Sequence, residues 1–158
     1  MRNIKLENIL SDGIDLDYSV GVIEDLNCTK CGNDGIDLSN TTLKLTQYTS
    51  SNTGDKSISV GENSILEAKG INIDNTKIGV AVKDGSIANL KNLNISSSKY
   101  PIAVYIKKQD FGFGNINIKN LILKNNLNPL ILEEGSIFNF DNNYPIQVKK
   151  NVFTKIYP

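Results

Sequence analysis

The chain contains no histidine and no tryptophan, and arginine occurs once, as Arg2. The missing histidine excludes catalytic sites that use an imidazole as the base, including Ser–His and Cys–His pairs. The 17 basic and 17 acidic residues cancel, so no overall charge attracts the chain to nucleic acid or to an anionic membrane surface. No apolar run approaches the roughly 20 residues that cross a bilayer. We therefore expect no nucleic-acid partner and no membrane partner.

A repeat of 22 residues organises most of the chain. The stretch GIDL at 13–16 returns at 35–38. Further along the chain, two apolar residues separated by one other residue recur at the same spacing. These pairs are Ile14/Leu16, Ile36/Leu38, Ile58/Val60, Val80/Val82, Ile102/Val104 and, after a step of 28, Leu130/Leu132. The longer step coincides with residues 107–114, which we expect to form a loop insertion. A fixed period of this length marks a solenoid.

Each repeat holds further apolar pairs, which predict three short strands per repeat. The alternation with polar residues is typical of strands that are buried on one face. The second pairs are Leu43/Leu45, Leu66/Ala68, Ala88/Leu90 and Ile116/Ile118, and the third pairs are Leu26/Cys28, Ile71/Ile73, Leu93/Ile95 and Leu121/Leu123. Between them lie the connectors Lys69-Gly70, Lys91-Asn92 and Lys119-Asn120. Gly and Asn tolerate left-handed backbone angles, so each connector predicts a sharp corner.

This pattern resembles the right-handed parallel β-helix of the pectin-lyase-like superfamily over essentially the whole chain. We predict a single all-β domain over residues 1–158, with about six rungs of 22 residues and three parallel sheets. We use rung for one turn of the helix, and the rungs begin near residues 14, 36, 58, 80, 102 and 130. The resemblance implies that the strands opening each rung form the first sheet, which usually carries the ligand. A two-sheet β-sandwich is the alternative, but it leaves the strict register unexplained.

The two ends of the repeat predict different surroundings. Ile4/Leu6 precedes Leu26/Cys28 by 22 residues, so the chain starts partway round a rung. Such an end exposes unpaired backbone. We therefore expect a fragment of a longer protein, whose N-terminal end is covered by the rest of its parent chain or by another subunit. Residues 141–158 interrupt the repeat with aromatic residues and Pro, and we expect them to form a C-terminal cap.

Two outward columns on the first sheet supply the candidate ligand-binding residues. One column runs through Asp15, Asp37, Ser59 and Ala81, and the next through Asp17, Lys83 and Tyr105. Rungs about 4.8 Å apart bring Asp15 and Asp37 close enough to repel each other or to recruit a cation. We expect no cofactor other than Ca²⁺, for which Asp15, Asp17 and Asp37 offer oxygen ligands. The alternative is that these Asp residues do ordinary turn chemistry.

The first-sheet stretches SDGIDL, NDGIDL, GDKSISVG and IGVAVK resemble those of polygalacturonase-type glycoside hydrolases. The resemblance implies catalytic places for Asp12 and Asp34, and it gives Lys83 the place of the Lys in the last of the family's motifs. The chain departs from that family in three places. It has no His, Ala81 stands where the family has Arg, and Asn33-Asp34 stands where the family has two Asp residues. We therefore expect a non-catalytic domain.

The insertion carries a group of aromatic and basic residues: Tyr105, Lys107, Lys108, Phe111 and Phe113. Aromatic faces stack on sugar rings and Lys attracts anionic groups, so these residues are candidates for binding polysaccharide. Alternatively, both Phe side chains fold back and cover the core where the insertion widens it.

Cys28 and Cys31 form a lone C-x-x-C motif. A zinc ribbon needs a second such pair. Because Cys28 and Cys31 overlie Leu6 and Ile9 in the repeat, we expect small core residues with free thiols.

The sequence thus favours a non-catalytic β-helix module of a microbial surface or secreted protein that binds or displays polysaccharide. One alternative is a polysaccharide-degrading enzyme, a polygalacturonase-like hydrolase or a lyase, that uses the stacked residues Asp12, Asp34 and Asp37. Another is a structural or oligomerising stem, as in adhesins and tail-spike-like proteins. We expect an extracellular or cell-surface location, although the alternating first ten residues do not resemble a signal peptide.

Overall fold

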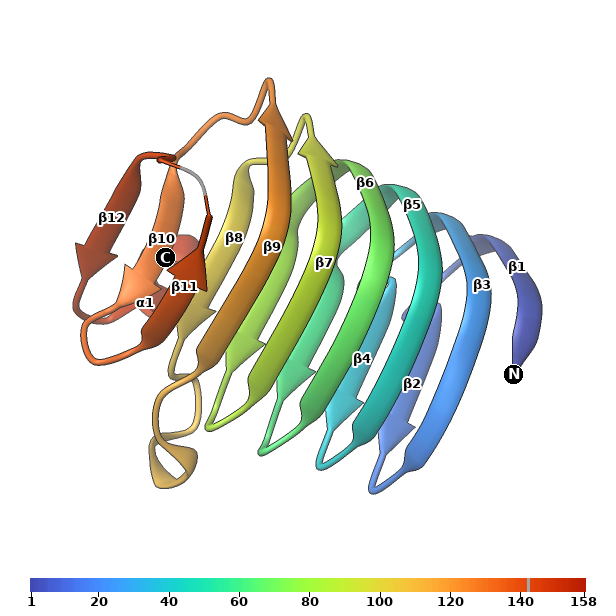
Figure 1. Cartoon of the computed structure of the whole chain (residues 1–158), viewed down its shortest axis with the longest axis horizontal. Helices are drawn as coiled ribbons and strands as arrows, with labels where there is room; N and C mark the ends of the chain where they lie inside the picture. Colours follow the sequence, from blue (N-terminus) through green and yellow to red (C-terminus); the bar gives the residue numbers. More distant parts are fainter. Residues whose placement is uncertain (142) are drawn as a thin grey trace.

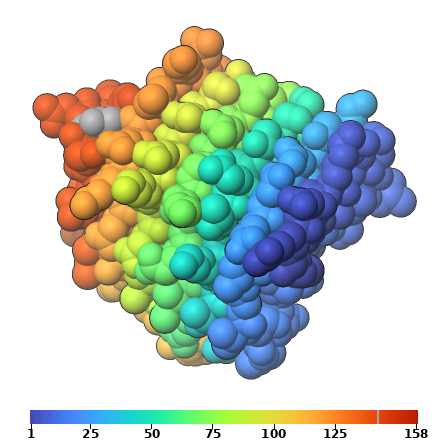
Figure 2. All heavy atoms as spheres, turned by 45° about the vertical axis from the view of Figure 1, so that its right-hand side comes forward, coloured from blue at the N-terminus to red at the C-terminus, as the bar shows by residue number. Residues whose placement is uncertain are grey.

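A computed structural model describes residues 1–141 and 143–158. Over these residues the chain coils into a parallel β-solenoid of about six rungs, with its two termini at opposite ends (Figure 1). Figure 2 shows successive rungs as parallel bands, from blue at the N-terminal end to red at the C-terminal end. The predicted all-β parallel β-helix is therefore confirmed.

Some strands cover a single side of the coil, whereas others continue round one of its corners. They are β1 (Arg2–Ile9), β2 (Ile14–Asp17), β3 (Val20–Cys31), β4 (Ile36–Ser39), β5 (Thr42–Gly61), β6 (Ile65–Lys83), β7 (Ile87–Ser96), β8 (Tyr100–Tyr105), β9 (Asn115–Lys124), β10 (Leu130–Glu133), β11 (Ile137–Phe140) and β12 (Ile146–Lys149). A 3₁₀ helix η1 spans Gln109–Phe111, and an α-helix α1 spans Val152–Ile156.

Successive rungs pair in parallel at the predicted spacing. The opening strands form a first ladder through Ile14, Ile36, Ile58, Val80 and Ile102, in steps of 22 residues. We call the ladder of the second apolar pairs the second ladder and that of the third pairs the third ladder. The step of 28 residues follows β8, where residues 106–114 leave the strand and include η1.

The core lies inside the coil and consists of the predicted inward pairs. Ile36, Leu38, Ile58 and Val60 are fully buried and belong to one apolar cluster that runs through the solenoid. Burying an aliphatic side chain of this size contributes about 1.5–3 kcal/mol. Stacking like residues in every rung therefore stabilises the coil along its whole length.

The corners between the second and third ladders have the predicted left-handed backbone. The φ angles are 71° at Gly70, 57° at Asn92 and 59° at Asn120. The Asn120 amide nitrogen donates to the Asn92 amide oxygen at 2.7 Å, which ties two neighbouring corners together. The residues before these corners, Lys69, Lys91 and Lys119, lie in register from one rung to the next.

The N-terminal end of the solenoid exposes a strand edge. β1 pairs with β3, which places Ile4 beside Leu26 and Leu6 beside Cys28, as the repeat predicts. Among the described residues no strand pairs with the other edge of β1. That another chain, or more of the parent protein, covers this edge stays a prediction.

The C-terminal residues close the other end of the core and also fold over its outside. Phe140, Tyr144 and Ile146 pack against the main core, and β12 pairs with β10. The buried side chains of α1, Val152 and Ile156, lie on the outer face of the first ladder, where they pack against Ile78, Ala81, Ala103, Tyr105 and Ile131. Within the described part of the chain, no helix is long and apolar enough to span a membrane.

Candidate functional site

The Asp residues at the corner before the first ladder bind backbone of the next rung. Asp12 accepts hydrogen bonds from the Asp34 backbone N–H and the Asn33 side-chain amide, both at 2.8 Å. Asp34 accepts one from the Lys56 backbone N–H at 3.0 Å, and the Lys56 ammonium lies 3.1 Å from the same carboxylate oxygen. Each carboxylate thus satisfies a backbone donor of the following rung, which is a structural task.

Asp34 is 1% exposed, so it cannot reach a polymer at the surface. Burial raises the pKa of Asp34 to about 6, although the charge and the hydrogen bonds of Lys56 act to lower it. For Lys56, burial disfavours the ammonium form, but Asp34 and Asp55 outweigh that effect and raise its pKa. The two side chains therefore form a buried salt bridge. Its attraction does not fully offset the free-energy cost of removing the Asp34 carboxylate from water.

The outer face of the first ladder, predicted to bind the ligand, is covered in part by the chain itself. The expectation that Tyr105 faces a ligand is wrong, because it is 1% exposed and stacks on Phe153 with ring centroids 5.9 Å apart. Glu133 holds the start of α1 by accepting the Asn151 N–H at 2.6 Å and the Val152 N–H at 2.8 Å. The small residues Ala81 and Ala103 thus accommodate the C-terminal segment, in place of the extended ligand that the sequence suggested.

The structure brings together Asp37, Ser59 and Lys83 from the expected ligand face. Ser59 and Lys83 are both buried, and the Lys83 ammonium donates to the Ser59 hydroxyl at 2.8 Å. The same nitrogen lies 3.6 Å from a carboxylate oxygen of Asp37. Lys83 reaches these groups across Gly61, where a Cβ atom would lie 2.7 Å from the ammonium. Lys83 therefore completes an internal polar contact and does not extend into solvent.

The proposed calcium ligands lie on the open part of the first ladder. Asp15 pairs in register with Asp37, and Asp17 follows on the same strand. Partial burial and the charges of Asp17 and Asp37 raise the pKa of Asp15. Among the described residues, no group of three or more acidic, Cys or His side chains is placed to hold a metal ion. A Ca²⁺ site at these residues stays a prediction.

The insertion after β8 is anchored by a buried acid that the sequence reasoning missed. Asp84 is fully buried, and one of its carboxylate oxygens accepts the backbone N–H groups of Lys107 and Lys108, both at 2.7 Å. Phe113 is 49% exposed, and its ring lies against Gly135. Phe111 is half-buried, and neither Phe belongs to an apolar core cluster. The alternative in which both Phe side chains cover the core is therefore wrong.

Cys28 and Cys31 are buried, as the repeat predicts, but the expectation of free thiols is wrong because they form a disulfide. Their Cα atoms are 6.2 Å apart, within the range that a disulfide bridges. The bond lies at the corner that leads from the third ladder to the first. Gly13 passes so close that a Cβ atom there would lie 2.7 Å from the Cys28 sulfur.

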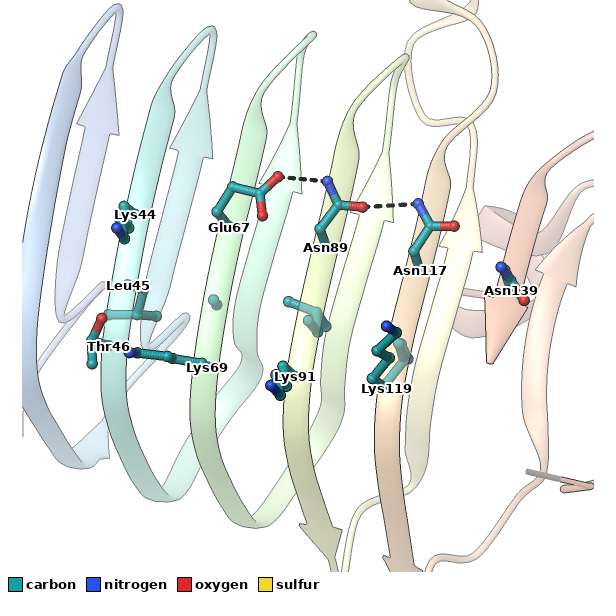
Figure 3. A pocket seen from close by; sticks show the side chains of 13 residues that line it. Lys44, Leu45, Thr46, Glu67, Lys69, Asn89, Lys91, Asn117, Lys119 and Asn139 are labelled. Carbon is teal, nitrogen blue, oxygen red and sulfur yellow. Dashed lines mark hydrogen bonds between the residues drawn. The ribbon is translucent and has the colours of Figure 1, made fainter. Parts of the chain in front are cut away.

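A groove crosses the strands on the outer surface of the second ladder (Figure 3). Its volume is about 410 Å³, and it extends from β5 to Asn139 of β11. One side is an in-register column of outward side chains: Lys44, Glu67, Asn89, Asn117 and Asn139. The other side is the column Thr46, Lys69, Lys91 and Lys119. Four steps of about 4.8 Å make the groove roughly 19 Å long.

Hydrogen bonds orient the polar side of the groove. The Asn89 amide nitrogen donates to Glu67 Oε1 at 2.6 Å, and the Asn117 amide nitrogen donates to Asn89 Oδ1 at 2.9 Å. Figure 3 shows these bonds running from rung to rung along one side. A polar surface that is oriented before the ligand arrives loses less conformational entropy on binding.

The signal for this groove is present in the sequence. Lys69, Lys91 and Lys119 precede the Gly/Asn corners, and a 22-residue repeat with one longer step stacks them in a column. From the sequence alone these positions indicate turns, and the resemblance to pectin-lyase-like proteins implies a ligand on the first sheet instead.

Comparison of the chain with protein-family models, with curated proteins and with solved structures finds no match in any of the three. The class of protein is therefore defined by its own geometry. It is a parallel β-solenoid with a polar groove along its second ladder and a C-terminal segment folded over its first ladder.

Proposed function

We propose that this chain is a non-catalytic β-helix module that binds an extended polysaccharide in the groove of the second ladder. One observation carries the proposal: the groove repeats similar polar side chains in register from rung to rung. A polymer of sugar residues is itself a repeat of similar polar groups, so one polymer can make the same contact several times. Amide groups such as those of Asn89 and Asn117 both donate and accept hydrogen bonds, which suits sugar hydroxyls.

The stacked Asp residues support binding over hydrolysis. A glycoside hydrolase needs two carboxyl groups that flank a sugar linkage, one as acid and one as base or nucleophile. Asp12 and Asp34 instead accept backbone amides, and Asp34 is buried. Asp37 lies 3.6 Å from the Lys83 ammonium. With no His in the chain, no imidazole is available to assist.

We also propose that the module works outside the cell or at its surface. A disulfide persists in oxidising compartments, so the Cys28–Cys31 bond supports the expected extracellular or cell-surface location. The 22-residue register and the Gly/Asn corners support a relationship to the pectin-lyase-like superfamily. The groove lies on the second ladder, whereas that resemblance implies a ligand on the first.

The test measures binding and sugar release together on a panel of neutral and acidic polysaccharides. We expect the chain to bind at least one polymer and to release no new reducing ends. The double variant Asn89→Ala/Asn117→Ala should weaken binding about tenfold, since it removes two hydrogen-bonding side chains. The matched control is Asn72→Ala/Asn94→Ala, which removes a comparable amide pair from the third ladder.

Two results would overturn the proposal. Release of reducing ends that Asp37→Ala abolishes would make the chain a hydrolase. If the chain bound no polymer in the panel, polysaccharide binding would be ruled out, and a structural stem would be the remaining function.

A further inference from the structure

We infer that the groove selects acidic polysaccharides, in which carboxylate or sulfate groups recur along the chain, and that Lys69, Lys91 and Lys119 contact these groups. The inference rests on the proposed function and names the chemical class of its ligand. It follows from the charges, the side-chain types and the spacing of the groove.

The groove is positively charged in a chain that is neutral overall. Four lysines and one glutamate line it, which gives a local net charge of +3, whereas the formal net charge of the chain is zero. Lys69, Lys91 and Lys119 are exposed, and within residues 1–141 and 143–158 none of the three has an ion-pair partner. Their ammonium groups can therefore bind an anion without breaking an internal contact.

The spacing of the lysines suits a polymer that carries charges at regular intervals. Lys69 pairs in register with Lys91, and Lys91 with Lys119. Neighbouring rungs lie about 4.8 Å apart, a distance comparable to the length of a sugar ring. Figure 3 shows the three lysines on one side of the groove and the hydrogen-bonded Glu67, Asn89 and Asn117 on the other. A linear polymer in the groove would meet ammonium groups along one edge and amides along the other.

The composition of the groove argues against a neutral sugar and against nucleic acid. Among the described residues that line the groove, none is aromatic, so neither a sugar ring nor a base finds a flat surface to stack on. The floor of the groove also includes aliphatic residues whose side chains are buried in the core: Leu45, Ala68, Leu90 and Ile118. Affinity must then come from charge and hydrogen bonds, which an acidic polysaccharide supplies together.

The experiment compares two polymers with the same backbone, carboxymethyl cellulose and hydroxyethyl cellulose, and adds alginate as a polyuronate. Binding is measured for the full chain and for the triple variant Lys69→Gln/Lys91→Gln/Lys119→Gln. The control triple variant, Lys30→Gln/Lys99→Gln/Lys155→Gln, removes the same charge from exposed lysines outside the groove. Urea unfolding of both variants checks that the fold is retained.

The expected result is preferential binding of the acidic polymers, weakened about tenfold by the groove variant and less than twofold by the control. Added salt should weaken wild-type binding more steeply than binding by the groove variant. Equal affinity for acidic and neutral polymers, or equal effects of the two triple variants, would overturn the inference and leave the proposed function standing. Equally tight binding of single-stranded oligo-dT would also overturn it. If the chain bound no polysaccharide at all, both the proposed function and this inference would be overturned.

Discussion

The phenol oxygen of Tyr157 lies 2.8 Å from each carboxylate oxygen of Asp55, a residue 102 positions earlier in the chain. The Lys77 ammonium lies 3.6 Å from the centroid of the same ring. Burial acts to raise the pKa of Asp55, but the Lys56 ammonium, the Tyr157 hydroxyl and Lys77 outweigh it and lower that pKa. This contact holds the C-terminal segment against the outside of the first ladder.

Tyr157→Phe should therefore loosen the C-terminal segment while the solenoid stays folded. The variant loses a hydrogen bond to a partly buried carboxylate, which we expect to cost about 1–2 kcal/mol in the free energy of unfolding. Faster hydrogen exchange at the Tyr157 backbone amide, which bonds to Phe153 at 2.9 Å, would locate the change. Tyr100→Phe is the matched control, because Tyr100 packs against the same cluster and its hydroxyl donates no hydrogen bond to residues 1–141 or 143–158. Equal effects of the two variants would contradict this role of Asp55.

The buried Asp34 should make stability depend on pH in a defined direction. Its pKa is raised from 3.8 to about 6, so the folded chain binds the proton more tightly than the unfolded chain does. The stabilisation from the protonated form is complete below about pH 4 and is lost as the pH rises towards 6. The stability of the wild type relative to Asp34→Asn should fall by up to about 3 kcal/mol between pH 4 and pH 7. Urea unfolding at a series of pH values measures this, and a difference that is flat or rises with pH would contradict it.

The Cys28–Cys31 disulfide should leave no titratable thiol in the unfolded chain until reductant is added. Because it closes a loop of only a few residues, the chain-entropy relation gives a stabilisation of about 2 kcal/mol. Cys28→Ala/Cys31→Ala should lose about that amount and keep the solenoid, as measured by circular dichroism and urea unfolding. Detection of two thiols in the unreduced, denatured protein would show that the bond is absent.

The sequence predicts the coil well because every rung must repeat the same geometry. Ile36 and Ile58 lie in register because each occupies the same place in successive rungs, and Asn92 and Asn120 turn the chain for the same reason. The period in the sequence therefore predicts the core positions and the corners of every rung together. It also places Lys69 above Lys91, although the meaning of that column is clear only when its neighbours across the groove are known.

Contacts outside the repeat could not be read from the period. Residues 150–158 follow the last paired strand and have no counterpart in earlier rungs, so nothing in the spacing shows that Val152 and Ile156 cover Ala81 and Ala103. That covering is why Tyr105 is buried although its strand position faces outward. The pairing of Cys28 with Cys31 likewise depends on the shape of one corner, which the repeat alone does not describe.

The most direct test of the central claim is to map the ligand on the folded chain. The protein has 158 residues and a mass of 17.4 kDa, which suits amide chemical-shift mapping with isotope-labelled protein. During titration with an alginate-derived oligouronate, we predict that the largest shifts fall on groove residues such as Lys69, Asn89 and Lys119. Shifts confined to the first ladder around Asp15 and Asp37, or no shifts at all, would contradict the account.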